Sequence, residues 1–136
     1  MTKAESRVHV LNASQTEVFG QLSDLTHFES LRDRLPADKA KVTNLTADSI
    51  TVEVQPVGPI TLEIVEREPE KCIKFASVGS SMPLNLWIQL LPMGEDQCRM
   101  KITIGVELNP FMAAMAKPYL QDGVEKLSDG IAKAFA

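Results

Sequence analysis

The chain has 136 residues and a formal net charge of -4, with 44% hydrophobic and 24% charged residues. A domain of this length buries roughly two-thirds of its unfolded surface, so we expect one domain spanning residues 1–136. The acidic balance, with a sequence pI near 5.2, argues against a nucleic-acid partner because phosphate binding needs a basic surface. The sequence has neither a signal-type apolar segment nor an apolar run of membrane-spanning length, which predicts a cytoplasmic protein without integral membrane contact.

The N-terminal segment predicts a half-buried strand. Residues 6–12 alternate, with Val8 and Val10 on one side and Arg7 and His9 on the other. Alternation of this kind is typical of a strand with one dry face, so we expect the two valines to face the core.

Two short helices are expected after this strand. Ser14 and Glu17 have the spacing of a capping box, which begins the first helix. Asp24 can cap a second helix, and Pro36 ends it because the residue before a proline avoids the helical conformation.

From residue 41 to residue 108 the apolar period is two, which predicts an antiparallel meander and a curved sheet of about seven strands in total. The candidate strands are residues 41–46, 50–54, 60–64, 72–77, 84–90 and 98–108. Their inner apolar side chains are Ile50, Val52, Val54, Ile60, Leu62, Ile64, Ile73, Phe75, Leu84, Leu86, Ile88, Leu90, Met100, Ile102, Ile104, Val106 and Leu108. None of these can act as a general acid or base, which weighs against an enzyme.

A long helix is expected over residues 109–135. Asn109 is a good N-cap and Pro110 suits the first helical turn. Its second half carries an apolar stripe of Leu120, Val124, Leu127, Ile131 and Phe135. Pro118 should kink or break the helix and partly uncouple the first half, which contains Phe111, Met112 and Met115. That first half forms either a flexible flap over a cavity mouth or a plug at the end of a solid core.

The order of these elements resembles the START-like, or SRPBCC, superfamily with its Bet v 1-like helix-grip fold. The most specific local piece is Ala13-Ser14-Gln15-Thr16-Glu17-Val18-Phe19, followed by Leu22-Ser23-Asp24, which is similar to the family's passage from first strand to first helix. The resemblance covers nearly the whole chain. It implies an α+β fold in which a curved antiparallel sheet grips a C-terminal helix across its concave face.

The resemblance also implies a function. Its members commonly enclose a hydrophobic cavity between sheet and helix and bind lipids, sterols, polyketides or plant hormones. We therefore expect a small hydrophobic ligand, held by Phe75, Leu86, Ile88, Ile102, Ile104, Met112, Met115, Tyr119 and Val124. Two alternatives stay open, because a shared fold does not choose a function. One is a cyclase or dehydratase acting on a polyketide-like substrate, with Tyr119 as the one nameable polar group, and the other is an interaction module of the chaperone-cofactor kind.

No metal or other cofactor is expected. Iron-binding members of this superfamily use two histidines and a carboxylate, and His9 and His27 have no carboxylate that the sequence places beside them. Cys72 and Cys98 lack metal-site spacing, and one strand should separate them in the sheet, which is too far for a disulfide.

Trp87 falls on the outer face of its predicted strand. A large aromatic side chain in such a place indicates a partner surface and suggests a homodimer through this face. The alternative is that the aliphatic stems of Arg99 or Lys101 cover the ring.

Overall fold

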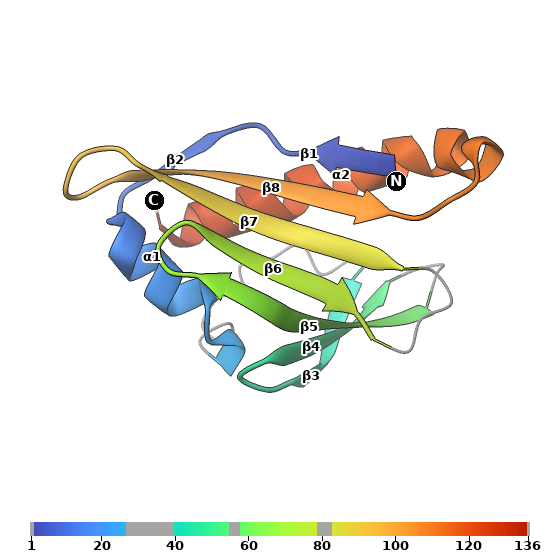
Figure 1. Cartoon of the computed structure of the whole chain (residues 1–136), viewed down its shortest axis with the longest axis horizontal. Coiled ribbons are helices and arrows are strands. Elements are labelled where there is room, and N and C mark those ends of the chain that lie inside the picture. Colours follow the sequence, from blue (N-terminus) through green and yellow to red (C-terminus); the bar gives the residue numbers. More distant parts are fainter. Residues whose placement is uncertain (1, 27–39, 55–57, 79–82, 136) are drawn as a thin grey trace.

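A strongly curved antiparallel sheet and a long C-terminal helix make up most of the structure (Figure 1). The structure, a computed structural model, describes residues 2–26, 40–54, 58–78 and 83–135. The elements are β1 Thr2–Glu5, β2 His9–Leu11, α1 Gln15–Leu22, β3 Ala40–Leu45, β4 Ser49–Val54, β5 Gly58–Glu68, β6 Cys72–Ser77, β7 Leu84–Pro92, β8 Cys98–Val106 and α2 Pro110–Ala134. This arrangement confirms the predicted helix-grip fold.

The strands follow the order β1-β8-β7-β6-β5-β4-β3, with β2 also paired to β8. From β3 to β8 each strand pairs with the next, which is the predicted meander. The sheet has eight strands. The extra strand is β1, which lies before the strand predicted over residues 6–12, whereas β2 falls within that predicted strand.

The predicted orientation of the N-terminal strand is wrong. Val8 and Val10 are 57% and 50% exposed, whereas Leu11 is buried and His9 faces α2. The reason is a one-residue change of register: Ala4 pairs with Ile104 in β1, but His9 pairs with Met100 in β2. One extra residue therefore lies in the N-terminal segment, and because side chains alternate with a period of two, it exchanges the inner and outer faces.

Ser6 stabilises the chain between β1 and β2. Its backbone N-H donates to the Ile102 carbonyl at 2.8 Å, and its buried hydroxyl accepts from the Ile102 N-H at 3.0 Å. The hydroxyl thus takes a place that a backbone carbonyl fills in a regular ladder, and the break leaves no buried side-chain donor or acceptor unsatisfied in the described part of the chain.

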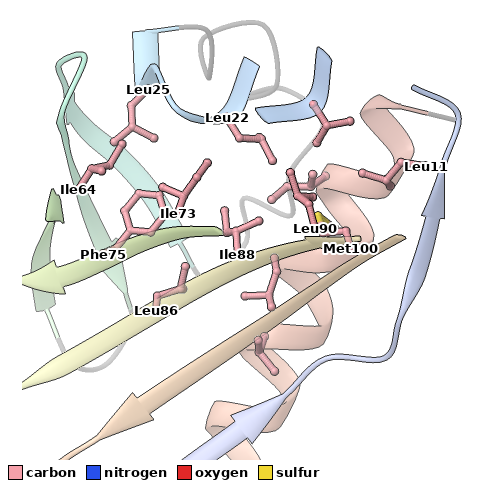
Figure 2. Close-up of a cluster of buried hydrophobic side chains, with 14 of the residues drawn as sticks. Leu11, Leu22, Leu25, Ile64, Ile73, Phe75, Leu86, Ile88, Leu90 and Met100 are labelled. Atoms are coloured by element: carbon pink, nitrogen blue, oxygen red, sulfur yellow. The ribbon is translucent and has the colours of Figure 1, made fainter. Parts of the chain in front are cut away.

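In β6 and β7 the observed alternation matches the prediction, whereas in β8 Thr103, expected on the wet face, is also buried. Figure 2 shows Ile73, Phe75, Leu86, Ile88 and Leu90 on the side of the sheet that faces Leu22 and Leu25, and all five are buried. The inner face of β4 is described only in part, because the side chains of Val52 and Val54 lie outside the described residues, as does the second helix beyond Thr26.

Both described helices begin as predicted. The Ser14 hydroxyl accepts from the Glu17 N-H at 3.1 Å, and the Asn109 side chain accepts from the Met112 N-H at 2.9 Å. α1 contacts β6 and β7, whereas α2 contacts β1, β2 and β8. Pro118 does not interrupt α2, which runs without a break from Pro110 to Ala134. Among the described residues neither helix is long and apolar enough to cross a membrane.

Candidate functional site

The strand residues expected to bind a ligand lie together on the concave face. Phe75 pairs with Leu86, and Leu86 pairs with Ile104, so these three form one row across β6, β7 and β8. Ile88 and Ile102 are directly paired in the next row. All five therefore share one apolar surface, and each is buried except Ile104, which is partly buried.

Burial on the helix side of this surface is uneven. Ile102 is fully buried, but Leu62, Ile104 and Leu120 are only partly buried, and Ile60 is likewise only partly covered. Val124, the predicted ligand residue in the second half of α2, belongs to the packed cluster. The sheet and α2 are thus closely packed along part of their length and less covered near Leu120.

The other three predicted ligand residues lie in the exposed first half of α2. Phe111, Met112, Met115 and Tyr119 are 76%, 51%, 62% and 81% exposed. We call these four residues the arm patch. Residues three or four apart share one side of a helix, so the spacing from Phe111 through Met115 to Tyr119 makes this a continuous apolar strip.

Alanines occupy the sheet-facing positions of the same half. Counting back from Leu120 in steps of four and three reaches Ala116 and Ala113, and both are partly buried. The side chains that continue the buried stripe of α2 are therefore the smallest apolar ones, while the large ones point elsewhere. The sequence pattern alone does not separate these two faces, because it predicts Met112, Met115 and Tyr119 as the ligand residues of this half.

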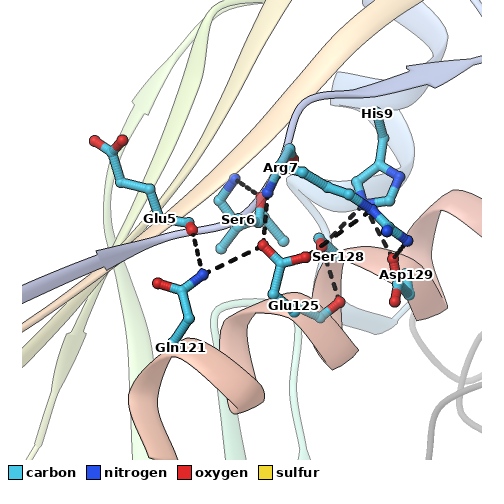
Figure 3. A network of polar contacts seen from close by, with 9 residues as sticks. Glu5, Ser6, Arg7, His9, Gln121, Glu125, Ser128 and Asp129 are labelled. Carbon is cyan, nitrogen blue, oxygen red and sulfur yellow. Dashed lines mark hydrogen bonds and ion pairs between the residues drawn. The ribbon is translucent and has the colours of Figure 1, made fainter. Parts of the chain in front are cut away.

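A network of polar contacts fixes the second half of α2 to the N-terminal strands (Figure 3). The Arg7 backbone N-H donates to the Glu125 carboxylate at 2.7 Å, and the Arg7 guanidinium contacts Asp129 at 2.5 Å. The Gln121 amide donates to the Glu5 carbonyl at 2.8 Å. We call this network the latch. All of its partners on α2 lie within residues 121–129.

The latch also contains a serine, a histidine and an aspartate, but their geometry is not that of a catalytic triad. Ser128 Oγ and Asp129 Oδ1 both approach the same ring nitrogen, Nε2 of His9, at 3.0 and 3.2 Å. A triad needs the acid and the nucleophile on opposite ring nitrogens. The Ser128 hydroxyl is fully buried and donates to the Glu125 carbonyl at 3.0 Å, so His9 is left to donate to it.

Sequence reasoning missed two ionisable residues on the concave side. His9 lies there because of the register change, and Arg67 lies opposite Ile73 because β5 has an irregularity between Ile64 and Glu66. The Arg67 guanidinium donates to the Ser23 carbonyl at 2.9 Å and to Asp48 at 2.6 Å, joining the end of α1 to the turn between β3 and β4. A strict period of two cannot reveal such residues, because each bulge shifts the pattern that follows it.

The cysteines and the described acidic residues form no metal site. Within the described ranges no group of three or more His, Cys, Asp and Glu residues is arranged around a common centre. Cys72 and Cys98 are free thiols on strands separated by β7, as predicted. Burial raises the pKa of the Cys98 thiol, and burial together with Glu68 and Glu66 raises that of Cys72, so both favour the neutral form.

Trp87 lies on the convex face, half-buried, as its predicted strand position implied. The side chains over its ring are lysines, but not the ones expected. Lys3 Nζ and Lys74 Nζ lie 5.5 and 5.8 Å from the ring centroid. Lys74 is on β6, next to β7, and Lys3 is on β1, beyond β8 on the other side. Both are within cation–π range.

Comparison with solved structures identifies the fold. A point mutant of norcoclaurine synthase from Thalictrum flavum, in complex with a transition state analogue, matches with a TM-score of 0.74 and 16% identity over 98% of this chain and 92% of that one. The chain has the START-like helix-grip fold. A START superfamily protein from Mycobacterium smegmatis matches with a TM-score of 0.72 and 12% identity, covering 98% of this chain and 96% of that one.

At these identities the START-like resemblance concerns architecture. No family model and no curated protein sequence matches the chain. The predicted resemblance is thus confirmed in the fold, and function has to be argued from the side chains of this chain.

Proposed function

We propose that this START-like domain, spanning residues 1–136, binds a small hydrophobic ligand between the concave face of the sheet and α2. The ligand class is a lipid or a sterol-like, quinone or polyketide-like molecule, bound in the cytoplasm. Phe75, Leu86, Ile88, Ile102, Ile104 and Val124 form the apolar wall in this proposal. Met112, Met115 and Tyr119 form the rim over which the ligand enters.

The observation that carries the proposal is the contrast within α2. Ala113 and Ala116 are small where the helix continues its sheet-facing stripe, and Ile104 and Leu120 beside it are incompletely covered. An apolar ligand placed there gains about 25 cal/mol for each Å² of apolar surface removed from water. The arm patch would supply further apolar surface as the ligand enters, and methionine suits ligands of irregular shape.

Native mass spectrometry tests the proposal directly. The purified protein should retain a lipid, or gain the mass of one fatty acid when fatty acids are added, with a one-to-one stoichiometry. A fluorescent fatty-acid analogue gives the affinity. The absence of binding across a broad panel of lipids, sterols and quinones contradicts the proposal.

A matched pair of variants localises the binding. Met115 and Leu91 are almost equally exposed, at 62% and 63%, but Leu91 lies at the end of β7 and outside the arm patch. We expect Met112→Ser with Met115→Ser to weaken binding about tenfold through lost apolar contact. Leu91→Ser should leave the affinity unchanged. An equal loss of affinity in the Leu91 variant and in the double methionine variant would show that binding is non-specific.

An enzymatic role remains the alternative prediction. Two titratable groups that the structure places toward the concave side are engaged in structural contacts: His9 with Ser128 and Asp129, and Arg67 with Asp48. A third, the buried thiol of Cys98, favours its neutral form because burial raises its pKa. Tyr119 is exposed on the arm patch. These contacts favour binding over catalysis as the proposal.

A homodimer through the convex face near Trp87 also stays a prediction. Trp87→Ala removes the aromatic anchor of such an interface. Sedimentation of the wild type and this variant tests it, and a monomer in both cases removes it.

A further inference from the structure

A hollow of about 180 Å³ lies on the convex face of the sheet beside Trp87. Its walls are Glu66, Glu68, Cys72, Lys74 and Trp87. The register places Glu66, Lys74 and Trp87 in one row across β5, β6 and β7, and Glu68 beside Cys72 in the adjacent row. Three consecutive strands therefore build it, on the face of the sheet opposite the proposed hydrophobic site.

The lining of the hollow carries more negative than positive charge. Its lining has the carboxylates of Glu66 and Glu68 against the single ammonium of Lys74. In the described part of the chain, neither carboxylate has a hydrogen-bond or ion-pair partner. Burial is the largest cause of the raised pKa of the Cys72 thiol, and Glu68 and Glu66 raise it further against the smaller opposing effect of Lys74.

The indole ring supplies the second element of recognition. Lys74 Nζ lies 5.8 Å from the centroid of the Trp87 ring, and Lys3 Nζ lies 5.5 Å from it. An aromatic face attracts ammonium groups through its quadrupole, and recognition of alkylated ammonium ions uses aromatic walls in this way. Lys74, which also lines the hollow, therefore already brings one ammonium group within cation–π range of this ring.

We propose that this hollow binds a small organic ammonium ion. The charged group lies near the carboxylates of Glu66 and Glu68, and its alkyl part packs against Trp87. Two lysines oppose the binding. Lys74 brings a positive charge into the lining, and the ammonium groups of both Lys74 and Lys3 already lie over the ring. The volume of about 180 Å³ is below the range of roughly 300–1,000 Å³ for drug-sized ligands, so the cation is small.

Trp87 reports on its own site, because the chain has one tryptophan. The experiment is a fluorescence titration of the full chain, with selective tryptophan excitation at constant ionic strength. Choline is the cationic probe and 3,3-dimethylbutan-1-ol is its neutral counterpart of nearly the same shape. We expect a saturable change with choline and a response to the neutral alcohol at least about tenfold weaker.

Two substitutions of opposite effect test the roles of the charges. Glu66→Gln combined with Glu68→Gln should weaken choline binding about tenfold, because it removes both charged acceptors. Lys74→Gln should strengthen it about threefold, because it removes one of the two competing ammonium groups from the ring and leaves that of Lys3. Glu95→Gln, an exposed carboxylate in the turn between β7 and β8, is the control and should change nothing.

Thermal unfolding of each variant confirms that the fold is retained, and because Lys74→Gln is expected to gain affinity, its effect cannot be confused with a folding defect. Equal responses to choline and the alcohol overturn the proposal, as does unchanged affinity in both variants. A saturable response to sodium phosphate that Lys74→Gln abolishes would assign the hollow to anions instead. A fluorescence change that follows protein concentration would assign it to self-association, and this also overturns the proposal.

Discussion

The two halves of α2 belong to one continuous helix but have opposite surroundings. In residues 120–134, Val124, Ser128 and Ile131 are buried, and the latch joins this half to Arg7 and His9. In residues 110–119, the arm patch is exposed and none of the contacts of the latch is present. Pro118 lies close to the boundary.

The difference teaches that apolar content and apolar burial are separate properties of a helix. Phe111, Met112 and Met115 are as apolar as Val124 and Ile131, but they lie off the stripe that faces the sheet. Alanines occupy that stripe in the first half. Large exposed apolar side chains above small inward ones are expected where surface is kept for a partner or ligand rather than for the core.

The largest expected effect contrasts one residue from each half. Ile131→Ala should lower the free energy of unfolding by about 3 kcal/mol, because it removes buried methyl and methylene groups and leaves a cavity. Met115→Ala should change it by less than about 0.5 kcal/mol, because the side chain is exposed. Urea denaturation of both variants measures the difference, and similar losses would show that the first half also belongs to the core.

A larger side chain in the first half of α2 tests whether there is open space between this half and the sheet. Ala116→Phe places a large ring on the sheet-facing stripe. If the space is open to a ligand, binding of the fluorescent fatty acid should fall about tenfold while the unfolding free energy changes little.

The contrary outcome of this substitution is equally clear. If the helix is instead closely packed against the sheet at this position, Ala116→Phe should lower the free energy of unfolding by about 1–3 kcal/mol through overpacking. Ala114→Phe, at an exposed position of the same half, is the matched control and should affect neither quantity.

Much of the sheet could be predicted because its strands obey one simple rule. In β6 and β7 buried and less buried residues alternate, as between Leu84 and Leu90, since one face packs against the core and the other faces outward. The rule failed at β1 and β2, where one added residue exchanged the faces of Val8 and His9. Local pattern cannot predict such a shift, because it depends on pairing with a strand almost a hundred residues away.

The candidate site was predictable only in its strand half. Phe75, Leu86 and Ile88 follow from alternation, whereas the orientation of Met112 and Met115 depends on how α2 rotates against the sheet. That rotation is set by long-range contacts, among them Arg7 with Glu125. No sequence spacing relates these residues, so the latch could not be inferred before the fold was known.

A smaller effect is expected at the boundary between the halves. Pro118 lacks a backbone N-H and cannot complete the hydrogen-bond ladder of α2 at its position. Pro118→Ala should raise the free energy of unfolding by about 1 kcal/mol, less than the full helix penalty of proline because proline also restricts the unfolded chain. Hydrogen exchange should show increased protection of the amides of residues 111–117, and unchanged protection there would mean that the first half is already coupled to the second.

The smallest expected effect concerns the charged part of the latch. Arg7→Ala should cost only about 0.5 kcal/mol, because the guanidinium is mostly exposed and its pairs with Glu125 and Asp129 are screened by water. The cost should fall further in high salt. The backbone N-H of residue 7 still donates to Glu125 in this variant, so Glu125→Gln combined with Arg7→Ala measures the coupling between the two side chains. A coupling energy much above about 1 kcal/mol would mean that charge, rather than the burial of Val124 and Ile131, holds the second half in place.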